Sequence, residues 1–146
     1  MNRVLLDSNI FLHALGKDEA LRHSCAEIID QLAAGAFVGE AACLLVNEVV
    51  HVRHRRSGDR RRAVLDGRAA AQLLVLRTVD DVDTITALEL FLSHERLQMN
   101  DAVQVAVARR YGLVTVLSTD RGLDGIPGLR RIDPVDREAV AQLIAG

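Results

Sequence analysis

The sequence contains few of the residues that hold small secreted domains together or that stack on nucleotide bases. It has two cysteines, two prolines and no tryptophan in 146 residues. Cys25 and Cys43 form no CxxC or Cys/His spacing, which excludes a zinc site and predicts two buried thiols in a reducing compartment. Three Phe and one Tyr offer few rings on which bases could stack.

Long hydrophobic runs are also missing from the chain. No apolar stretch approaches the roughly 20 residues that span a bilayer. Asp7 interrupts the first apolar run, so the N-terminal segment does not have the pattern of a signal peptide. We therefore expect a cytoplasmic protein with no membrane partner.

The net charge of −2, from 18 basic and 20 acidic side chains, argues at first against a nucleic-acid partner. However, residues 51–62 carry six arginines against one aspartate, a balance of +5, so the rest of the chain carries −7. This segment is a solvated helix end and loop, a surface for phosphates, or a surface for a protein partner. Its arginines are Arg53, Arg55, Arg56, Arg60, Arg61 and Arg62.

The length fits one domain, residues 1–146, and the sequence shows no internal repeat or Pro/Ser-rich linker. Of its residues, 49% are hydrophobic and 26% charged, as in ordinary globular proteins. A domain of this size buries roughly 68–70% of the surface of its unfolded chain. It can therefore form a core without disulfides or a structural metal.

Apolar runs and helical periodicity alternate along the chain and predict an α/β fold, with a mainly parallel central sheet covered by helices on both faces. The expected strands are 3–6, 36–39, 77–79, 113–117 and 130–132. The expected helices are a short one after Ser8 or Asn9, then 19–34, 41–56, 60–76, 81–95, 100–111 and 136–145. Apolar faces at 41–52 and 102–108 exceed what one sheet needs, which favours a helix-mediated homodimer.

Two acids follow apolar strands, where ligand sites of parallel sheets lie. Asp7 closes the first strand and Asp120 follows the strand at 113–117. Taken singly, each is better explained as a helix cap or turn residue than as a site acid. Asp80, Asp81 and Asp83, at a predicted helix start, are better explained as caps than as metal ligands.

Two further acids lie within apolar helical sequence. Asp101 begins a predicted helix, where the helix dipole accounts for it, but no capping role explains the mid-helix Glu48. Four carboxylates at one sheet edge would repel one another unless a hard divalent cation such as Mg²⁺ or Mn²⁺ neutralised them. Such a cluster beside an arginine-rich segment points to phosphodiester cleavage.

The segments 4–9, 100–102 and 117–129 resemble, in order and spacing, the PIN domain, and in particular the VapC ribonucleases of type II toxin–antitoxin systems. The resemblance covers nearly the whole chain. It implies a Mg²⁺- or Mn²⁺-dependent endoribonuclease that acts on RNA as a toxin, forms a homodimer and is neutralised by a cognate antitoxin.

The resemblance also assigns residues. Its acidic motif positions, catalytic and metal-binding, fall on Asp7, Glu48, Asp101 and Asp120. Asn9 and Ser118 match its supporting polar positions, and Asp124 is an additional or alternative acid near the fourth position. Glu40 competes with Glu48 for the second position, but its neighbours Gly39 and Ala41 suggest a loop, which favours Glu48.

Other functions remain open at this point. The chain could be a PIN nuclease of RNA processing or of DNA, or a PIN-like binding module without activity, although all four acids are present. A haloacid-type phosphatase would need a second aspartate in the segment Asp7-Ser8-Asn9, and a receiver domain would need a lysine after a late strand. The only lysine is Lys17, far from such a strand.

Overall fold

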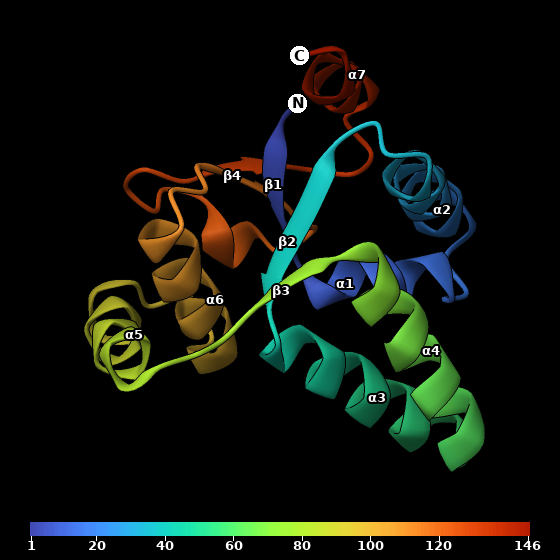
Figure 1. Cartoon of the computed structure of the whole chain (residues 1–146), viewed down its shortest axis with the longest axis horizontal. Helices are drawn as coiled ribbons and strands as arrows, with labels where there is room; N and C mark the ends of the chain where they lie inside the picture. Colours follow the sequence, from blue (N-terminus) through green and yellow to red (C-terminus); the bar gives the residue numbers. More distant parts are fainter.

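The computed structural model describes all residues, 1–146, and shows a five-stranded sheet between two layers of helices (Figure 1). The strand order is β3-β2-β1-β4-β5, and every neighbouring pair is parallel, which confirms the predicted α/β class. The strands are β1 (Arg3–Leu6), β2 (Val38–Ala42), β3 (Val75–Arg77), β4 (Thr115–Leu117) and β5 (Arg130–Ile132).

Seven α-helices and one short 3₁₀ turn connect the strands. They are α1 (Ser8–Ala14), α2 (Glu19–Ala33), α3 (Leu44–Ser57), α4 (Arg60–Leu73), α5 (Asp81–Ser93), α6 (Met99–Arg110), η1 (Arg121–Leu123) and α7 (Arg137–Ala145). None of the helices combines the length and the apolar character that a membrane span requires.

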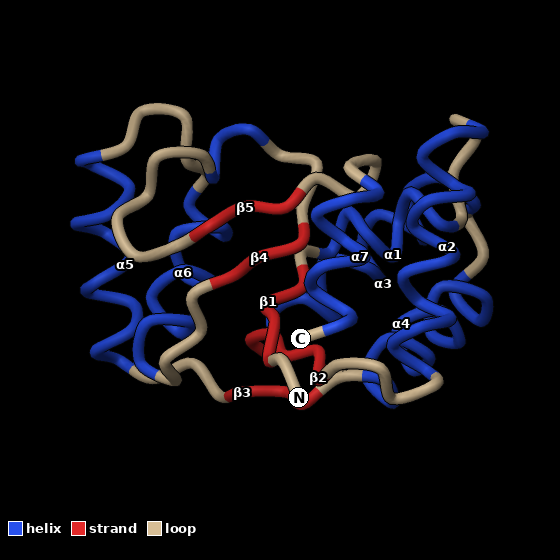
Figure 2. Tube along the Cα trace, turned by 90° about the horizontal axis from the view of Figure 1, so that it is seen from above, coloured by secondary structure: helices blue, strands red, loops and turns tan.

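The pleat of β1 divides the core in two. Val4 and Leu6 point into one apolar cluster with residues of α1, α2, α3, α4 and α7, whereas Leu5 points into a second cluster with residues of α5 and α6. Figure 2 shows α5 and α6 on one side of the strands and the other helices on the opposite side. Helices therefore cover both faces, as predicted.

The second strand lies further along the chain than the sequence indicated. It was expected at 36–39, but β2 begins at Val38 and continues to Ala42. Gly39 lies inside this strand. A Cβ at this position would come within 2.8–2.9 Å of the side chains of Leu6, Leu74 and Leu32, which is why the residue is glycine. This glycine marks close packing, and the prediction of a loop around Glu40 is wrong.

Glu40 is a buried structural acid. It accepts hydrogen bonds from Arg3 Nε at 2.6 Å and Arg77 Nε at 2.7 Å, which tie β2 to the strands on either side. Burial alone would raise the pKa of Glu40, but the hydrogen bonds from Arg77 and Arg3 hold it below its usual value. Both carboxylate oxygens are thus occupied by arginines.

Three other expectations meet different outcomes. Asp80 and Asp83 form a capping box at the start of α5, as predicted. Cys25 is buried, but the prediction that Cys43 is buried is wrong, because it lies exposed at the start of α3.

The prediction of a dimer face on residues 102–108 is also wrong. Six of these seven residues are buried within the single chain because α6 lies between the sheet and α5. The apolar surface that remains is on α5 instead. Its exposed side chains are Val82, Ile85, Leu88, Phe91 and Leu92, from 49% to 85% accessible.

Candidate active site

The carboxyl ends of β1 and β4 lie side by side, at the point where the strand order reverses. In parallel sheets this switch point opens a crevice in which ligands bind. The Asp7 amide donates to the Leu117 carbonyl at 3.1 Å, so the acid that ends β1 is fixed beside the end of β4. The fold therefore places the first predicted acid where a site is expected.

A network of short hydrogen bonds orients the Asp7 carboxylate. Ser118 Oγ donates to Asp7 Oδ2 at 2.6 Å, and Asn9 Nδ2 lies 3.1 Å from both that oxygen and Ser118 Oγ. The Asp120 amide donates to the same Ser118 Oγ at 2.9 Å. Asn9 and Ser118, predicted as supporting residues, thus connect the acid after β1 to the acid after β4.

Glu48 reaches this network from α3. Ser8 Oγ donates to Glu48 Oε2 at 2.7 Å, and the same hydroxyl lies 3.4 Å from Asp7 Oδ1. The other oxygen, Glu48 Oε1, is buried without any hydrogen-bond partner. A buried, unpartnered carboxylate oxygen is costly and needs a positive or polar group beside it.

Asp101 comes to the site from the opposite helical layer. Gln104, one turn further along α6, accepts a buried hydrogen bond from the Ala42 amide at 2.9 Å and so fixes the helix at the end of β2. The first turn of α6 then lies over the carboxyl edge of the sheet. The pKa of Asp101 is raised to about 8, first by burial and then by the negative charges of three other acids. These are Asp7, Asp120 and Glu48.

The pKa values of two other site acids are raised as well. For Asp7, burial is the main cause, opposed by the Ser118 hydrogen bond and reinforced by repulsion from Asp120. For Glu48, burial again dominates, with repulsion from Asp7, while hydrogen bonds from Ser8 and Asn100 act in the opposite direction. The site therefore concentrates negative charge that has no positive side chain to balance it.

The chemistry of these residues fits a divalent cation. The four acids supply hard oxygen donors, one oxygen is buried without a partner, and three pKa values are raised by burial and by repulsion within the group. As the side chains lie, no three His, Cys, Asp or Glu residues surround one point closely enough to hold a metal ion. A cation held by three or more of the acids would therefore require their side chains to turn toward it.

Asp124 does not join this group. It pairs with Arg131, whose Nε and Nη2 lie 2.6 and 3.3 Å from its two oxygens, and this hydrogen bonding lowers the pKa of Asp124. Asp120, by contrast, accepts from the Gly122 amide at 2.8 Å and begins η1. A Cβ at Gly122 would collide with the Arg96 carbonyl oxygen, so only glycine fits at this turn.

Sequence reasoning missed two polar residues of the site. Ser8 bridges Asp7 and Glu48, and the Asn100 side chain acts to lower the pKa of Glu48. Each is a small polar residue beside a predicted acid, Ser8 directly after Asp7 and Asn100 directly before Asp101. That adjacency is the only signal in the sequence that could have indicated them.

The arginine segment lies at the far end of α3, in the turn to α4 and in the first turn of α4. Arg53 is not free, because its Nε lies 2.8 Å from Asp66 Oδ2 and both side chains are mostly buried. Arg62 lies 3.9 Å from the other oxygen of Asp66. The remaining four arginines of the segment, Arg55, Arg56, Arg60 and Arg61, are exposed and have no acidic partner.

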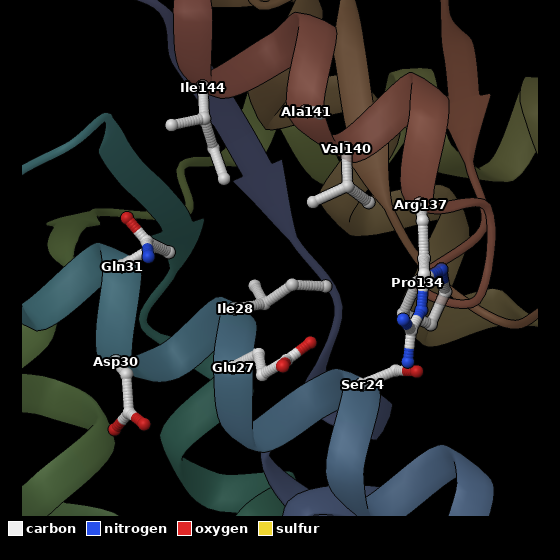
Figure 3. A pocket seen from close by; sticks show the side chains of 10 residues that line it. All are labelled: Ser24, Glu27, Ile28, Asp30, Gln31, Pro134, Arg137, Val140, Ala141 and Ile144. Carbon is white, nitrogen blue, oxygen red and sulfur yellow. The ribbon is translucent and has the colours of Figure 1, made fainter.

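A separate cavity of about 350 Å³ lies between α2 and α7. Figure 3 shows Ile28 and Glu27 of α2 facing Val140 and Ile144 of α7, with Arg137 at one end. None of the four acids lines it. The cavity is therefore distinct from the carboxylate site.

Comparison with known proteins places the chain in a family. The sequence profile of the PIN domain family matches residues 4–129, a range that contains all four acids. The chain belongs to the PIN domain family. This confirms the resemblance seen in the sequence, and the fold agrees with it.

Among similar proteins are ribonuclease VapC13 and ribonuclease VapC7, both of Mycobacterium tuberculosis. The first is 24% identical over 135 residues (88% of this chain and 98% of the relative), and the second is 29% identical over 119 residues (80% and 81%).

Solved structures share the fold of this PIN domain. VapBC2 of Rickettsia felis, bound to a DNA fragment from its promoter, gives a TM-score of 0.68 at 16% identity and covers 90% of this chain and 98% of that one. The Sarcin–Ricin loop cleaving toxin VapC20 of M. tuberculosis gives 0.64 at 18% identity, over 77% and 86%.

Proposed function

We propose that this PIN domain is a divalent-metal-dependent endoribonuclease of the cytoplasm, which cleaves RNA phosphodiester bonds and acts as the toxin of a toxin–antitoxin pair. The observation that carries the proposal is the convergence of Asp7, Glu48, Asp101 and Asp120, from both helical layers, on one sheet edge. Relatives named as VapC ribonucleases, aligned over 80% or more of this chain, support RNA as the substrate.

The four acids would hold Mg²⁺ or Mn²⁺. Bound there, such an ion would supply Lewis-acid chemistry, which would polarise a phosphoryl oxygen and lower the pKa of a water molecule. Ser118, Asn9 and Ser8 hold the carboxylates in place by hydrogen bonds to Asp7 and Glu48. Because the pKa of Asp101 is raised to about 8 in the metal-free protein, its carboxyl must give up a proton when the cation arrives.

The direct test incubates the purified protein with RNA in Mg²⁺ or Mn²⁺ and in excess chelator, and maps new RNA 5′ ends in cells after induction. Cleavage in metal, none in chelator, and growth arrest on expression are expected. A PIN nuclease of RNA processing would cut without arresting growth, and one acting on DNA would cut DNA instead. RNA binding without any cleavage would indicate a binding module.

An antitoxin is the proposed protein partner. An apolar groove of about 230 Å³ between α1, α2, α3 and α4 could accept an apolar segment of it, since nine of its eleven lining residues are hydrophobic. They include Phe11, Ala14, Ile29, Ala69 and Leu73. The structural relatives include VapBC complexes, which supports such a partner. A small reading frame directly upstream of the gene, whose product restores growth on co-expression, is the expected observation.

A second copy of the chain is the other proposed partner, through the exposed apolar face of α5 defined above. One helix with five large apolar side chains at 49–85% accessibility forms a patch of the kind that marks an interface. An isologous pair would bury the same face on both copies.

Leu88→Glu should therefore convert a dimer into a monomer, because it places a charge at the centre of this face. Sedimentation velocity would measure the change. Leu65→Glu on α4, at 55% accessibility against 52% for Leu88, is the matched control and should leave the dimer intact. A wild-type protein that sediments as a monomer contradicts the proposed interface.

A further inference from the structure

The α3–α4 hairpin carries a second groove, called the polar groove here because four of its eight lining residues are polar. It has a volume of about 420 Å³ and lies between the two helices. Its polar lining residues are Asn47, His51, His54 and Arg60. No acidic side chain lines it, so its charge favours an anion. The apolar groove, by contrast, is lined by other residues of the same helices, among them Val49, Asp66 and Leu73.

One stripe of α3 leads from the carboxylate site to this groove. With 3.6 residues per turn, Glu48, His51 and Arg55 lie on one stripe of the helix, and His51 also lines the groove. At 1.5 Å per residue the stripe extends about 10 Å from Glu48 to Arg55. A nucleic-acid strand that enters the site at Glu48 can thus continue onto the basic side chains of α3.

The hairpin holds these basic groups on a rigid support. Figure 1 shows α3 and α4 side by side, joined by a tight turn at the edge of the molecule. Gly58 takes φ +69° at the end of α3, and the Asp59 side chain accepts from the Arg62 amide to begin α4. A Cβ at Gly67 would collide with the Val50 side chain, so the helices pack closely.

The geometry points to this groove and stripe as a binding track for the phosphates of single-stranded RNA beside the cleaved bond, with His51, Arg55 and Arg60 as its contacts. The assignment rests on the proposed function and extends it to the substrate path. With few aromatic residues in the chain, backbone charge is the available means of holding RNA. An antitoxin on this face is the competing occupant.

The test compares wild type with the Arg55→Glu/Arg60→Glu double variant on a fluorescent single-stranded RNA at several salt concentrations. Both arginines are exposed and unpaired, so the fold should persist, as checked by circular dichroism. We expect KM to rise at least about 10-fold with kcat nearly unchanged. The slope of log Kd against log salt should fall by about 1.4, since each phosphate contact on a single strand contributes roughly 0.7.

Two further variants sharpen the result. The control Arg130→Glu/Arg137→Glu makes the same charge change at two exposed arginines on β5 and α7, away from the hairpin, and should leave the slope unchanged. Arg55→Lys/Arg60→Lys keeps the charge and should retain most of the binding. Equal KM and equal salt slope in wild type and the double Glu variant would overturn the track and leave this face to a protein partner.

Binding is also measured in chelator by fluorescence anisotropy, which separates this inference from the proposed function. If wild type fails to cleave RNA in metal, the proposed function is contradicted. Even then, the binding track would be supported if wild type binds RNA in a salt-dependent way and the double Glu variant does not. If the double Glu variant binds RNA as well as wild type does, the binding track is contradicted, even if wild type cleaves RNA.

Discussion

The Asp7→Asn variant is expected to lose metal-dependent RNA cleavage by at least about 100-fold, the size of effect seen when one group that stabilises a transition state is removed. Asp7 is the acid to which the others are connected, through Ser118 to Asp120 and through Ser8 to Glu48. An amide removes the negative charge that would bind the cation. Growth arrest on expression should be relieved at the same time.

The fold should survive this change. Asn is nearly the same size as Asp, and its carbonyl oxygen can still accept the hydrogen bond that Ser118 Oγ gives to Asp7. Initial rates on RNA, with circular dichroism as the check on folding, measure the effect. Asp124→Asn is the matched control, because Asp124 pairs with Arg131 and with none of the four acids, and it should keep near-wild-type activity. Full activity of Asp7→Asn would contradict the mechanism.

The metal-free protein is expected to become less stable as pH rises from about 4 to 8, and the site acids are the cause. The folded pKa of Asp101 is about 8, against 3.8 in the unfolded chain, so the folded state holds this proton over that range. Stability falls with pH wherever the folded state binds more protons than the unfolded state. Asp7 and Glu48 act in the same direction, since burial raises their pKa values too.

Asp101→Asn should remove the part of this pH-dependent loss of stability that Asp101 causes. In chelator, its melting temperature should exceed that of wild type by several degrees at pH 8 and by much less at pH 5, since about 1 kcal/mol shifts Tm by roughly 2–4 °C in domains somewhat larger than this one. Differential scanning fluorimetry across pH measures both. Mg²⁺ or Mn²⁺ should raise the wild-type Tm most at high pH, because a cation bound only by the folded state stabilises it.

Asp124→Asn again serves as the control, because the pKa of Asp124 is shifted in the opposite direction from that of Asp101. Hydrogen bonds from Arg131 lower the pKa of Asp124, so its carboxylate contributes stability that is present above pH 4 and lost as pH falls. The Asn variant should therefore be no more stable than wild type at pH 8. A wild-type Tm that does not respond to Mg²⁺ or Mn²⁺ at any pH would contradict the cation site.

Much of this architecture could be predicted from the sequence, because local patterns and chain order determine it. The unbroken apolar run before Asp7 predicts a strand buried on both faces, and β1 is one. The alternation of strands and helices then requires parallel pairing, which brings the carboxyl ends of β1 and β4 together. Asp7 and Asp120 thus lie at the same sheet edge, as expected, and the pairing of β1 with β4 makes them neighbours.

The features that could not be predicted depend on tertiary contacts. Gly39 resembles a turn residue locally, but three leucine side chains from other segments leave room only for glycine in a strand. The apolar face at 102–108 suggested an interface because nothing in the sequence shows that α5 covers it. Ser8 turns toward Glu48 across forty residues of chain, a contact that no local pattern encodes.

The two-layer arrangement has a mechanical consequence for the carboxylate site. Glu48 belongs to the layer with α3, and Asp101 belongs to the layer with α5 and α6, on the other side of the sheet. A cation held by both would act as a cross-link between the layers. Amide hydrogens of α6 should then exchange more slowly when the ion is bound, because local opening of that layer would first have to release it.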